Sequence, residues 1–350
     1  MPQKNRRRVS PGKILIVKPS SLGDIIHSLP LLDAVKRCYP ETAIHWVVAR
    51  GFEGILEGHP MIKKLWVIDK SGWKKLSNIG HTILDFKAMS NELKKERFDM
   101  AIDLQGLLRS GLISKASGAK VRIGLKGYRE AREGSFLFHT DRVSVGKGVL
   151  HAVDRYLSVA DYLGCESKEI AFPMPPQSEV SEHLKGVMKD PYAVFVPGAR
   201  WPTKRWPSEY FGELARIIKN NTGIGSLVVG SRDDEEIGRI IENSSGGSAV
   251  SIAGRSSLKE LVEVIRRARV VISTDSGPMH IASALGVPIV ALFGSTSPER
   301  TGPYGKNNIV IRSTAGCAPC LKRKCDNFIC MSSVEPKEVA GKALRFLRPE

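Results

Sequence analysis

The sequence predicts an α/β protein made of two doubly wound domains, each built on a parallel sheet. Three observations predict this fold class. Short apolar runs rich in Val and Ile alternate with longer amphipathic segments along nearly the whole chain, which is the pattern of β–α units. The alternation begins again after a proline-rich break near the middle. The 350 residues also suffice for two domains of ordinary size, each with its own core.

The N-terminal half begins with a basic tail, residues 1–12, which we expect to be disordered. The strands predicted after it are short apolar runs: 13–18, 44–48, 65–68 and 100–103. The predicted helices are 25–39, 81–96 and 151–163. Residues 120–147 are rich in Gly, Arg and Lys and lack a clear period, so we expect a functional loop region there.

The composition changes over 171–191, where Pro-Met-Pro-Pro places three prolines in four residues. Because proline runs interrupt regular structure, this stretch marks a domain boundary. We expect a first domain over 13–175, a linker over 176–191 and a second domain over 192–350, with the option that the last helix packs back on the first domain. The strands and helices expected at the start of the second domain are 193–196, 207–219, 226–229, 234–243, 250–252 and 258–267.

The stretch 270–305 is the strongest candidate for a ligand site. Its first residues, 270–273, form a buried-strand pattern, and the Thr-Asp-Ser-Gly-Pro that follows supplies turn and helix-start residues. Gly286 and Pro288 end a short helix before a second apolar run. Backbone N–H groups at that helix start would face the carboxyl ends of the strands, which suits a phosphate or diphosphate. A purely structural unit, in which Asp275 only caps the helix, fits the composition equally well.

The unusual bulk property is the formal charge, +17 at pH 7. Such an excess favours a polyanionic partner: a nucleic acid, an anionic membrane surface or a phosphorylated substrate. The apolar share of 42% and the charged share of 25% are ordinary for a globular protein. No apolar run approaches the ~20 residues that cross a bilayer, and the basic start of the chain lacks the apolar segment of a secretion signal. We therefore expect a cytoplasmic protein.

Six cysteines are present, and two of them, Cys38 and Cys165, stand isolated, which does not describe a secreted disulfide scaffold. The other four follow the spacing C-x2-C-x4-C-x4-C: Cys317, Cys320, Cys325 and Cys330. This spacing is similar to a zinc knuckle with Cys in place of His, so structural zinc is one interpretation and reduced thiols or a disulfide are the others. A knuckle and a basic chain would suit nucleic-acid binding. The aromatic share of only 7%, without aromatic–basic interleaving, argues against it.

Five blocks of the chain, taken in order, resemble those of glycosyltransferase family 9: VKPSSLGDIIHSLPLLDAVKRCYP, FDMAIDLQGLLRSGL, YREAREGS, PGARWPTKRWP and STDSGPMHIASALGVPIVALFGSTSPERTGPYG. The likeness extends over about 13–336. It implies the GT-B fold, in which two Rossmann-like domains face each other across a cleft, the first binding the acceptor and the second the ADP-sugar. It also implies an inverting transferase that needs neither a metal nor a cofactor.

The resemblance further implies the substrates. They are ADP-L-glycero-D-manno-heptose as the donor and the 3-deoxy-manno-octulosonic acid of lipid A as the acceptor, in synthesis of the lipopolysaccharide inner core. Such an enzyme works as a peripheral protein on the cytoplasmic face of the inner membrane, against an anionic surface and without a nucleic-acid partner. Another family 9 transferase with a different acceptor is the alternative within the fold, and a basic nucleic-acid-binding protein is the alternative of a different class.

Inversion at an anomeric carbon needs a carboxylate that takes the acceptor's proton and positive groups that stabilise the departing diphosphate. Asp24, in the Ser-Ser-Leu-Gly-Asp loop after the first strand, matches the general base of the family. Its structural alternative is a helix cap, a common role for aspartate. Ser20, Ser21 and Gly23 would shape this loop and offer hydroxyl or N–H groups to the donor.

Lys204 matches the family lysine that contacts the donor phosphate, where its point charge would offset the charge building on the leaving diphosphate. The structural alternative is a surface lysine in a basic loop. Ala199 and Arg200 occupy positions where the family often has small hydroxyl residues, and Arg200 is able to supply a phosphate contact of its own.

The donor-binding pattern D-[ST]-G-x-x-H of the family is matched by Asp275, Ser276, Gly277 and His280. The N–H groups of Ser276 and Gly277 would hold phosphate, and His280 would point back toward the same helix end. A packed or solvated histidine is the structural alternative. Ser256 matches a position that lines the adenine pocket. Four acids at 233–236 follow a strand in the region where a ribose-binding acid is expected.

The acceptor side is expected in the basic first domain. Residues in or near the segments that meet the acidic sugar and the lipid A phosphates in the family are Lys74, Lys75, Arg109, Arg129 and Arg132. The Ala-Arg-Glu block at 131–133 is the most specific of these signals. For Lys74 and Lys75 a solvated surface is the stronger alternative, because runs of charge usually are solvated faces.

Overall fold

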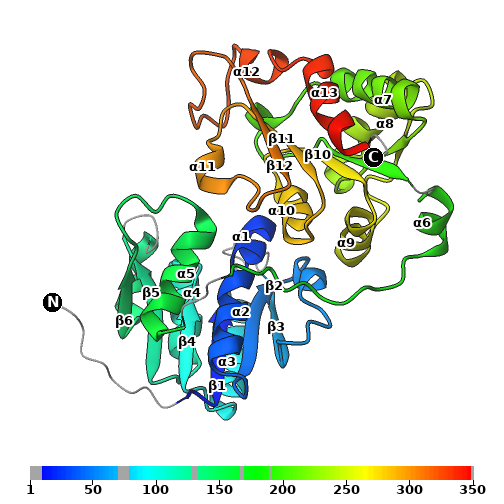
Figure 1. The fold of residues 1–350 in the computed structure, drawn as a ribbon. Helices are drawn as coiled ribbons and strands as arrows, with labels where there is room; N and C mark the ends of the chain where they lie inside the picture. The colour runs from blue at the N-terminus through cyan, green and yellow to red at the C-terminus, as the bar shows by residue number, and fades with distance from the viewer. Residues whose placement is uncertain (1–9, 70–78, 128–131, 166–168, 189–190, 348–350) are drawn as a thin grey trace. The chain divides into compact units, whose positions relative to one another are not determined.

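A computed structural model describes residues 10–69, 79–127, 132–165, 169–188 and 191–347, with only the backbone described at 79–83 and 132. Between Pro176 and Gln177 the chain divides into two compact units, each with its own six-stranded sheet (Figure 1). Neighbouring strands pair in parallel throughout both sheets. The predicted α/β fold class is confirmed.

The first unit has the strand order β3-β2-β1-β4-β5-β6. Its strands are β1 (Lys13–Val17), β2 (Ala43–Ala49), β3 (Lys64–Ile68), β4 (Met100–Asp103), β5 (Val121–Lys126) and β6 (Asp141–Ser144). Its helices are α1 (Leu22–His27), α2 (Leu29–Cys38), α3 (Ile79–Lys95), α4 (Leu108–Ala116) and α5 (Ala152–Leu163), with 3-10 segments η1 (Glu53–Ile55) and η4 (Arg132–Phe138). Ile14 of β1 pairs with Ile44 on one side and Met100 on the other, so β1 is a central strand.

The second unit has the order β12-β11-β10-β7-β8-β9. Its strands are β7 (Tyr192–Val196), β8 (Gly225–Val228), β9 (Ala249–Ser251), β10 (Val270–Thr274), β11 (Ile289–Phe293) and β12 (Asn308–Arg312). Its helices are α6 (Glu182–Val187), α7 (Ser208–Thr222), α8 (Glu235–Ser244), α9 (Leu258–Arg266), α10 (Gly277–Ala284), α11 (Pro298–Thr301), α12 (Ile329–Ser332) and α13 (Pro336–Leu347), with η5 (Pro202–Lys204) and η6 (Arg232–Asp234).

Counted within each unit, both strand orders are 3-2-1-4-5-6, the order of a Rossmann sheet. In such a sheet the order reverses between the first and fourth strands, and ligands bind beyond the carboxyl ends of the strands at that point. The reversal lies between β1 and β4 in the first unit and between β7 and β10 in the second. The loops that leave these four strands are therefore where the chemistry is expected.

The cores follow from the apolar runs of the central strands. Ile14, Leu15, Ile16 and Val17 of β1 are fully buried, as expected for a parallel strand that helices cover on both faces. In the second unit α13 packs against α7 and contributes apolar side chains to that unit's core. The last helix, for which packing on the first domain was an option, thus contributes to the core of the second unit.

Three expectations differ from the structure. The predicted helix 25–39 is two helices, α1 and α2, because Pro30 lacks the N–H that a continuous helix would need and instead occupies the first turn of α2. The predicted loop region 120–147 contains β5, η4 and the edge strand β6, and the Arg, Gly and Lys residues of this stretch conceal the apolar pattern of the two strands. The expected linker, 176–191, includes α6.

Cys38 and Cys165 are not isolated in space. Cys38 ends α2 and Cys165 follows α5, and because these two helices pack together the cysteines form a disulfide with a Cα–Cα distance of 5.3 Å. The linear sequence gave no sign of this pairing, since 127 residues separate the two positions. Within the described ranges, no helix combines the length and the apolarity needed to cross a membrane.

Candidate active site

Asp24 lies in the first turn of α1, directly after the loop that leaves β1. Its Oδ2 accepts hydrogen bonds from the Ser21 amide at 3.0 Å and the Ser21 hydroxyl at 2.7 Å. Its Oδ1 accepts a longer bond, 3.4 Å, from the Tyr156 hydroxyl of α5. The carboxylate therefore caps the helix with one oxygen, and the second oxygen interacts with a side chain 132 residues away. Capping and a catalytic role are compatible in this geometry.

Lys18, which directly follows β1, is the nearest source of positive charge for Asp24. Its side chain is buried, with 3% of the residue exposed, and its Nζ donates to the Leu104 carbonyl at 3.0 Å. The same Nζ lies 4.9 Å from the centre of the Tyr156 ring. Burial alone would lower the pKa of Lys18, but Tyr156, Asp24 and Asp103 outweigh it and raise that pKa above its ordinary value. Lys18 is therefore an ammonium ion at neutral pH.

The Asp24 carboxyl responds to this ammonium ion. Burial alone would raise its pKa, yet the charge of Lys18 and the hydrogen bonds from Ser21 outweigh burial and hold the pKa of Asp24 well below its usual range. Asp24 is thus ionised at every physiological pH. A carboxylate at the carboxyl edge of the sheet, already deprotonated, is able to accept a proton from a hydroxyl that reacts beside it.

Lys204 and Asp275 form the centre of the second unit's candidate site. Lys204 ends η5, after β7, and Asp275 follows β10, so both lie at the point where the strand order reverses. Lys204 Nζ is 2.7 Å from Asp275 Oδ2, and the Thr296 hydroxyl donates to the same oxygen at 2.6 Å. The Asp275 side chain is 6% exposed and that of Lys204 is 18% exposed. Two residues that the sequence linked to the donor phosphate are therefore one ion pair.

The start of α10 completes this region. Ser276 is the N-cap, Gly277 and Pro278 begin the helix, and no acidic side chain lies in its first turn. An eight-residue helix with this start presents N–H groups and a positive dipole end to an anion. His280 is buried, with 5% of the residue exposed, on the same short helix.

Other predicted donor residues lie on the loops of neighbouring strands. Ala199 is buried and its carbonyl accepts from Arg205 Nε at 3.0 Å, while Arg200 is exposed. Ser256 lies between β9 and α9. Among the acids at 233–236, Asp234 is distinguished by its contacts: a Cβ on Gly198, in the loop after β7, would come within 2.6 Å of its carboxylate. Asp234 also accepts from the Ser231 amide at 2.9 Å.

One of the predicted acceptor residues, Arg109, lies on the surface of the first unit. Arg109 is exposed on α4. Lys74, Lys75 and Arg129 lie outside the described residues, and of Arg132, the first residue of η4, only the backbone is described.

The cysteine-rich segment lies against the donor region. Cys317, Cys320, Cys325 and Cys330 are free thiols, and within the described part of the chain no three His, Cys, Asp or Glu side chains are arranged to hold a metal ion. The Thr203 hydroxyl donates to the Lys322 carbonyl at 2.7 Å, and the Leu321 amide donates to the Ser295 carbonyl at 2.7 Å. Arg323 lies 5.0 Å from the Trp201 ring, which Lys204 also approaches, at 4.7 Å. The segment thus contacts two loops of the candidate site through hydrogen bonds of its own main chain, one to the Thr203 hydroxyl and one to the Ser295 carbonyl.

Sequence reasoning missed Lys18, Tyr156 and Asp103. Lys18 carried a usable signal, because a lysine that closes a buried strand at a sheet's central position needs a buried partner. Asp103 carried a weaker one, as the last residue of a strand beside β1. Tyr156 carried no such signal, since it reaches Asp24 from a helix 132 residues away in the sequence.

The chain is similar to known heptosyltransferases in sequence and in fold. Residues 86–329 match the family model described as "Glycosyltransferase family 9 (heptosyltransferase)". Lipopolysaccharide heptosyltransferase 1 of Pseudomonas aeruginosa is 31% identical over 89% of this chain and 87% of its own length. Lipopolysaccharide heptosyltransferase 2 of Salmonella typhimurium is 29% identical, over 87% and 89%. The solved structure of the Escherichia coli heptosyltransferase WaaC with ADP superposes with a TM-score of 0.74 at 25% identity, covering 95% of this chain and 99% of that one.

Proposed function

The chain belongs to glycosyltransferase family 9, the heptosyltransferase family, and we propose that it transfers heptose from an ADP-heptose to the inner core of lipopolysaccharide. The donor is ADP-L-glycero-D-manno-heptose and the acceptor is the 3-deoxy-manno-octulosonic acid attached to lipid A. Similarity to a lipopolysaccharide heptosyltransferase 1 over 89% of the chain supports this choice. The observation that carries the chemistry is that Asp24 and the Lys204–Asp275 pair each lie where the strand order of their sheet reverses.

On the acceptor side, Asp24 acts as the general base. The attacking hydroxyl oxygen forms a bond to the anomeric carbon of heptose while its proton passes to a carboxylate oxygen of Asp24. Lys18 keeps that carboxylate ionised, and Ser21 orients it through two hydrogen bonds. Because the nucleophile attacks opposite the leaving group, the configuration at the anomeric carbon inverts.

On the donor side, Lys204 and the start of α10 bind the diphosphate. The bond between the anomeric carbon and the phosphate oxygen breaks, and the departing ADP gains negative charge. The Lys204 ammonium is paired with Asp275 at 2.7 Å, and on donor binding it would share its charge between that carboxylate and a phosphate oxygen. Positive charge at this position stabilises the transition state more than the ground state, because the leaving diphosphate gains negative charge as the bond breaks. Ser276, Gly277 and His280 contact the phosphates, and Ser256 lines the adenine pocket.

The partner that holds the acceptor is an anionic membrane surface. Exposed apolar side chains occur on two elements of the first unit that pack against each other, α4 and η4: Leu108, Leu112, Phe136 and Leu137. Basic groups accompany them, with Arg142 6.0 Å from the Phe136 ring and Lys115 5.8 Å from the Phe138 ring. Exposed apolar groups with nearby cations are the combination that binds the interface of an anionic bilayer.

A second candidate is the next transfer in the same core, because similarity to a lipopolysaccharide heptosyltransferase 2 is nearly as high. The two differ in acceptor and share the donor. Purified protein is mixed with ADP-heptose and either deacylated lipid A carrying 3-deoxy-manno-octulosonic acid or the same acceptor already bearing one heptose. ADP release with only the first acceptor supports the proposal. Release with only the second supports the alternative, and no release with either, together with salt-sensitive RNA binding, would favour a nucleic-acid-binding protein.

A further inference from the structure

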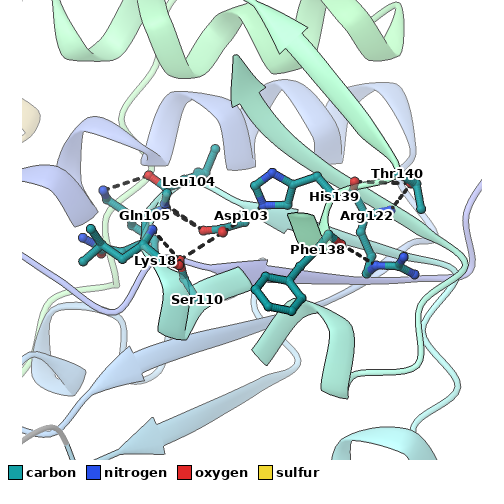
Figure 2. Close-up of polar contacts among 11 residues, drawn as sticks. Lys18, Asp103, Leu104, Gln105, Ser110, Arg122, Phe138, His139 and Thr140 are labelled. Carbon is teal, nitrogen blue, oxygen red and sulfur yellow. Dashed lines mark hydrogen bonds and ion pairs between the residues drawn. The ribbon is translucent and has the colours of Figure 1, made fainter. Parts of the chain in front are cut away.

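The first unit contains a fully buried Asp–His pair that the proposed chemistry does not use. Asp103 is the last residue of β4, and its Oδ2 lies 3.0 Å from Nε2 of His139. Both side chains are completely buried. Figure 2 shows the pair at the centre of a chain of polar contacts that ends at Lys18. Burying such a pair costs desolvation energy, so it contributes little to stability by itself.

The surroundings of His139 are shaped to hold its ring in one place. Arg122 donates from Nε to the Phe138 carbonyl at 2.7 Å and from its amide to the Thr140 hydroxyl at 2.8 Å, which fixes the backbone on both sides of His139. Gly124 of β5 leaves the space for the ring, because a Cβ there would lie 2.1 Å from it. Two strands and the η4 segment therefore present the His139 ring to Asp103.

Asp103 in turn fixes the loop that leaves β4. Its Oδ1 accepts from the amides of Gln105 and Gly106 at 2.9 and 3.0 Å, and its Oδ2 also accepts from the Ser110 hydroxyl at 2.9 Å. With His139, one carboxylate receives four hydrogen bonds. A carboxylate satisfied in this way allows the turn a single conformation.

This loop is in direct contact with the segment that carries Asp24. Gln105 Oε1 accepts from the Ser20 amide at 3.2 Å, the Leu104 amide donates to the Val17 carbonyl at 3.2 Å, and the Leu104 carbonyl accepts from Lys18 Nζ at 3.0 Å. Lys18 interacts electrostatically with both Asp24 and Asp103. The loop after β4 thus holds the loop after β1 in position through these three hydrogen bonds.

We propose that His139 and Asp103 are positioning residues for transfer: through Gln105 and Leu104 they set the place of Ser20 and Lys18, and thereby of the Asp24 carboxylate. Neither residue touches a substrate. The proposal rests on the proposed role of Asp24 as the base. Its consequence is that removing the hydrogen bond of a buried side chain slows the chemical step and leaves the affinity for ADP intact, because the Lys204–Asp275 pair proposed to bind the diphosphate belongs to the other unit.

The test compares two buried histidines of the same unit. His139→Leu removes the hydrogen-bond donor and retains much of the volume, whereas His139→Gln offers an amide N–H in a similar position. The matched control is His59→Leu, because His59 is also buried, at 4% exposure, and bonds to the Pro173 carbonyl at 3.0 Å. For each variant we would measure kcat, the Kd for ADP, the melting temperature and hydrogen exchange of the peptide that spans 18–24.

We expect kcat of His139→Leu to fall by roughly 10- to 100-fold, the order of loss that follows a misplaced catalytic group, with ADP affinity within about twofold of wild type. Exchange in the 18–24 peptide should become faster, and His139→Gln should recover a substantial part of both effects. His59→Leu should lose melting temperature without either effect. Equal kcat in His139→Leu and wild type, or equal losses in the two Leu variants, would overturn the proposal.

Two outcomes need a second measurement. If wild-type protein transfers no heptose, the proposed function fails, and the exchange rate of the 18–24 peptide in His139→Leu still decides whether the pair positions that loop. If His139→Leu does not fold, Gln105→Met breaks the same chain at the half-buried Gln105, and unchanged exchange together with unchanged kcat in that variant would reject the proposal.

Discussion

Lys204 Nζ and Asp275 Oδ2 lie 2.7 Å apart, in a site where the Thr296 hydroxyl bonds to the same carboxylate oxygen. The pair therefore holds a positive charge and a negative charge side by side at the position proposed for a diphosphate. Replacing the lysine alone would leave a nearly buried carboxylate without its cation. The variant would lose the attraction that the lysine exerts on the diphosphate. In addition, the unpaired Asp275 carboxylate would repel the diphosphate.

Lys204→Ala should accordingly weaken ADP binding and lower kcat together, because the diphosphate is charged in the ground state and in the transition state. The double variant Lys204→Ala with Asp275→Asn should bind ADP better than Lys204→Ala alone, since the unpaired charge is gone. Calorimetry of ADP binding to the four proteins of this cycle measures the coupling. Strictly additive losses in ADP binding would show that the two residues act independently.

Asp24→Asn should lower kcat by roughly 10²–10⁴-fold, the usual contribution of a general base, and change ADP affinity little. Asp24 is the N3 residue of a capping box whose N-cap is Ser21, and an asparagine oxygen there is still able to accept from the Ser21 amide, so a purely capping role predicts nearly unchanged turnover. Turnover of Asp24→Asn near the wild-type rate would therefore place the base elsewhere.

Much of the fold was predictable because it follows from local patterns. The apolar run of β1 and the turn residues before α10 identify a central strand and a helix start without any knowledge of their neighbours. The position of Asp24 just after the loop that leaves such a strand followed from the same pattern. The contact between Tyr156 and Asp24 could not be predicted in this way, and neither could the disulfide between Cys38 and Cys165. Both exist only because α5 packs beside α1 and α2 in the folded protein.

The last two strands on one side of the first sheet, β5 and the edge strand β6, were not predicted from the sequence. β5 and β6 carry Arg, Lys and Asp among their apolar residues, and His139, between η4 and β6, therefore appeared to belong to a loop. Its ring is buried against Asp103 because Gly124 leaves room for it, and a single sequence does not reveal that cavity.

The enzyme should retain full activity in excess chelator. Lys204 and the start of α10 already supply positive charge at the diphosphate, and the chain has no D-x-D motif of the kind that binds a donor metal. Transfer rates are measured before and after treatment with EDTA. A loss that magnesium or manganese reverses would contradict this expectation, and a loss that only zinc reverses would implicate the cysteines Cys317, Cys320, Cys325 and Cys330.

Leu137→Asp should weaken binding to anionic lipid vesicles by about tenfold or more, since the leucine is 72% exposed and burying such a side chain in a bilayer interface is worth roughly 1.5–3 kcal/mol. Leu84→Asp on α3 is the matched control, because Leu84 is 64% exposed in the same unit and belongs to neither α4 nor η4. Cosedimentation with phosphatidylglycerol vesicles measures the binding. Turnover of a deacylated acceptor should be the same in both variants, and equal vesicle binding by both would reject the α4–η4 surface.

The pH dependence of transfer should reveal Lys18. Because the pKa of Asp24 lies well below its usual range, the base is fully ionised above about pH 5, and wild-type kcat should show no acid limb from this group between pH 5 and 8. Lys18→Met removes the ammonium and leaves the effect of burial, which raises the pKa of a carboxyl. In that variant Asp24 should become protonated as the pH falls from 8 to 5, and kcat should fall with it.

The same acceptor titrates identically in both proteins, so the difference between the two pH profiles isolates Asp24. The double variant Lys18→Met with Asp24→Asn serves as the control. An amide does not become protonated in this pH range, so the residual kcat of the double variant should not show the fall at low pH that is expected for Lys18→Met. The kcat of wild type, Lys18→Met and the double variant is measured from pH 5 to 8 at saturating donor. A Lys18→Met profile parallel to wild type would mean that Ser21 alone keeps Asp24 ionised, because its two hydrogen bonds also favour the carboxylate.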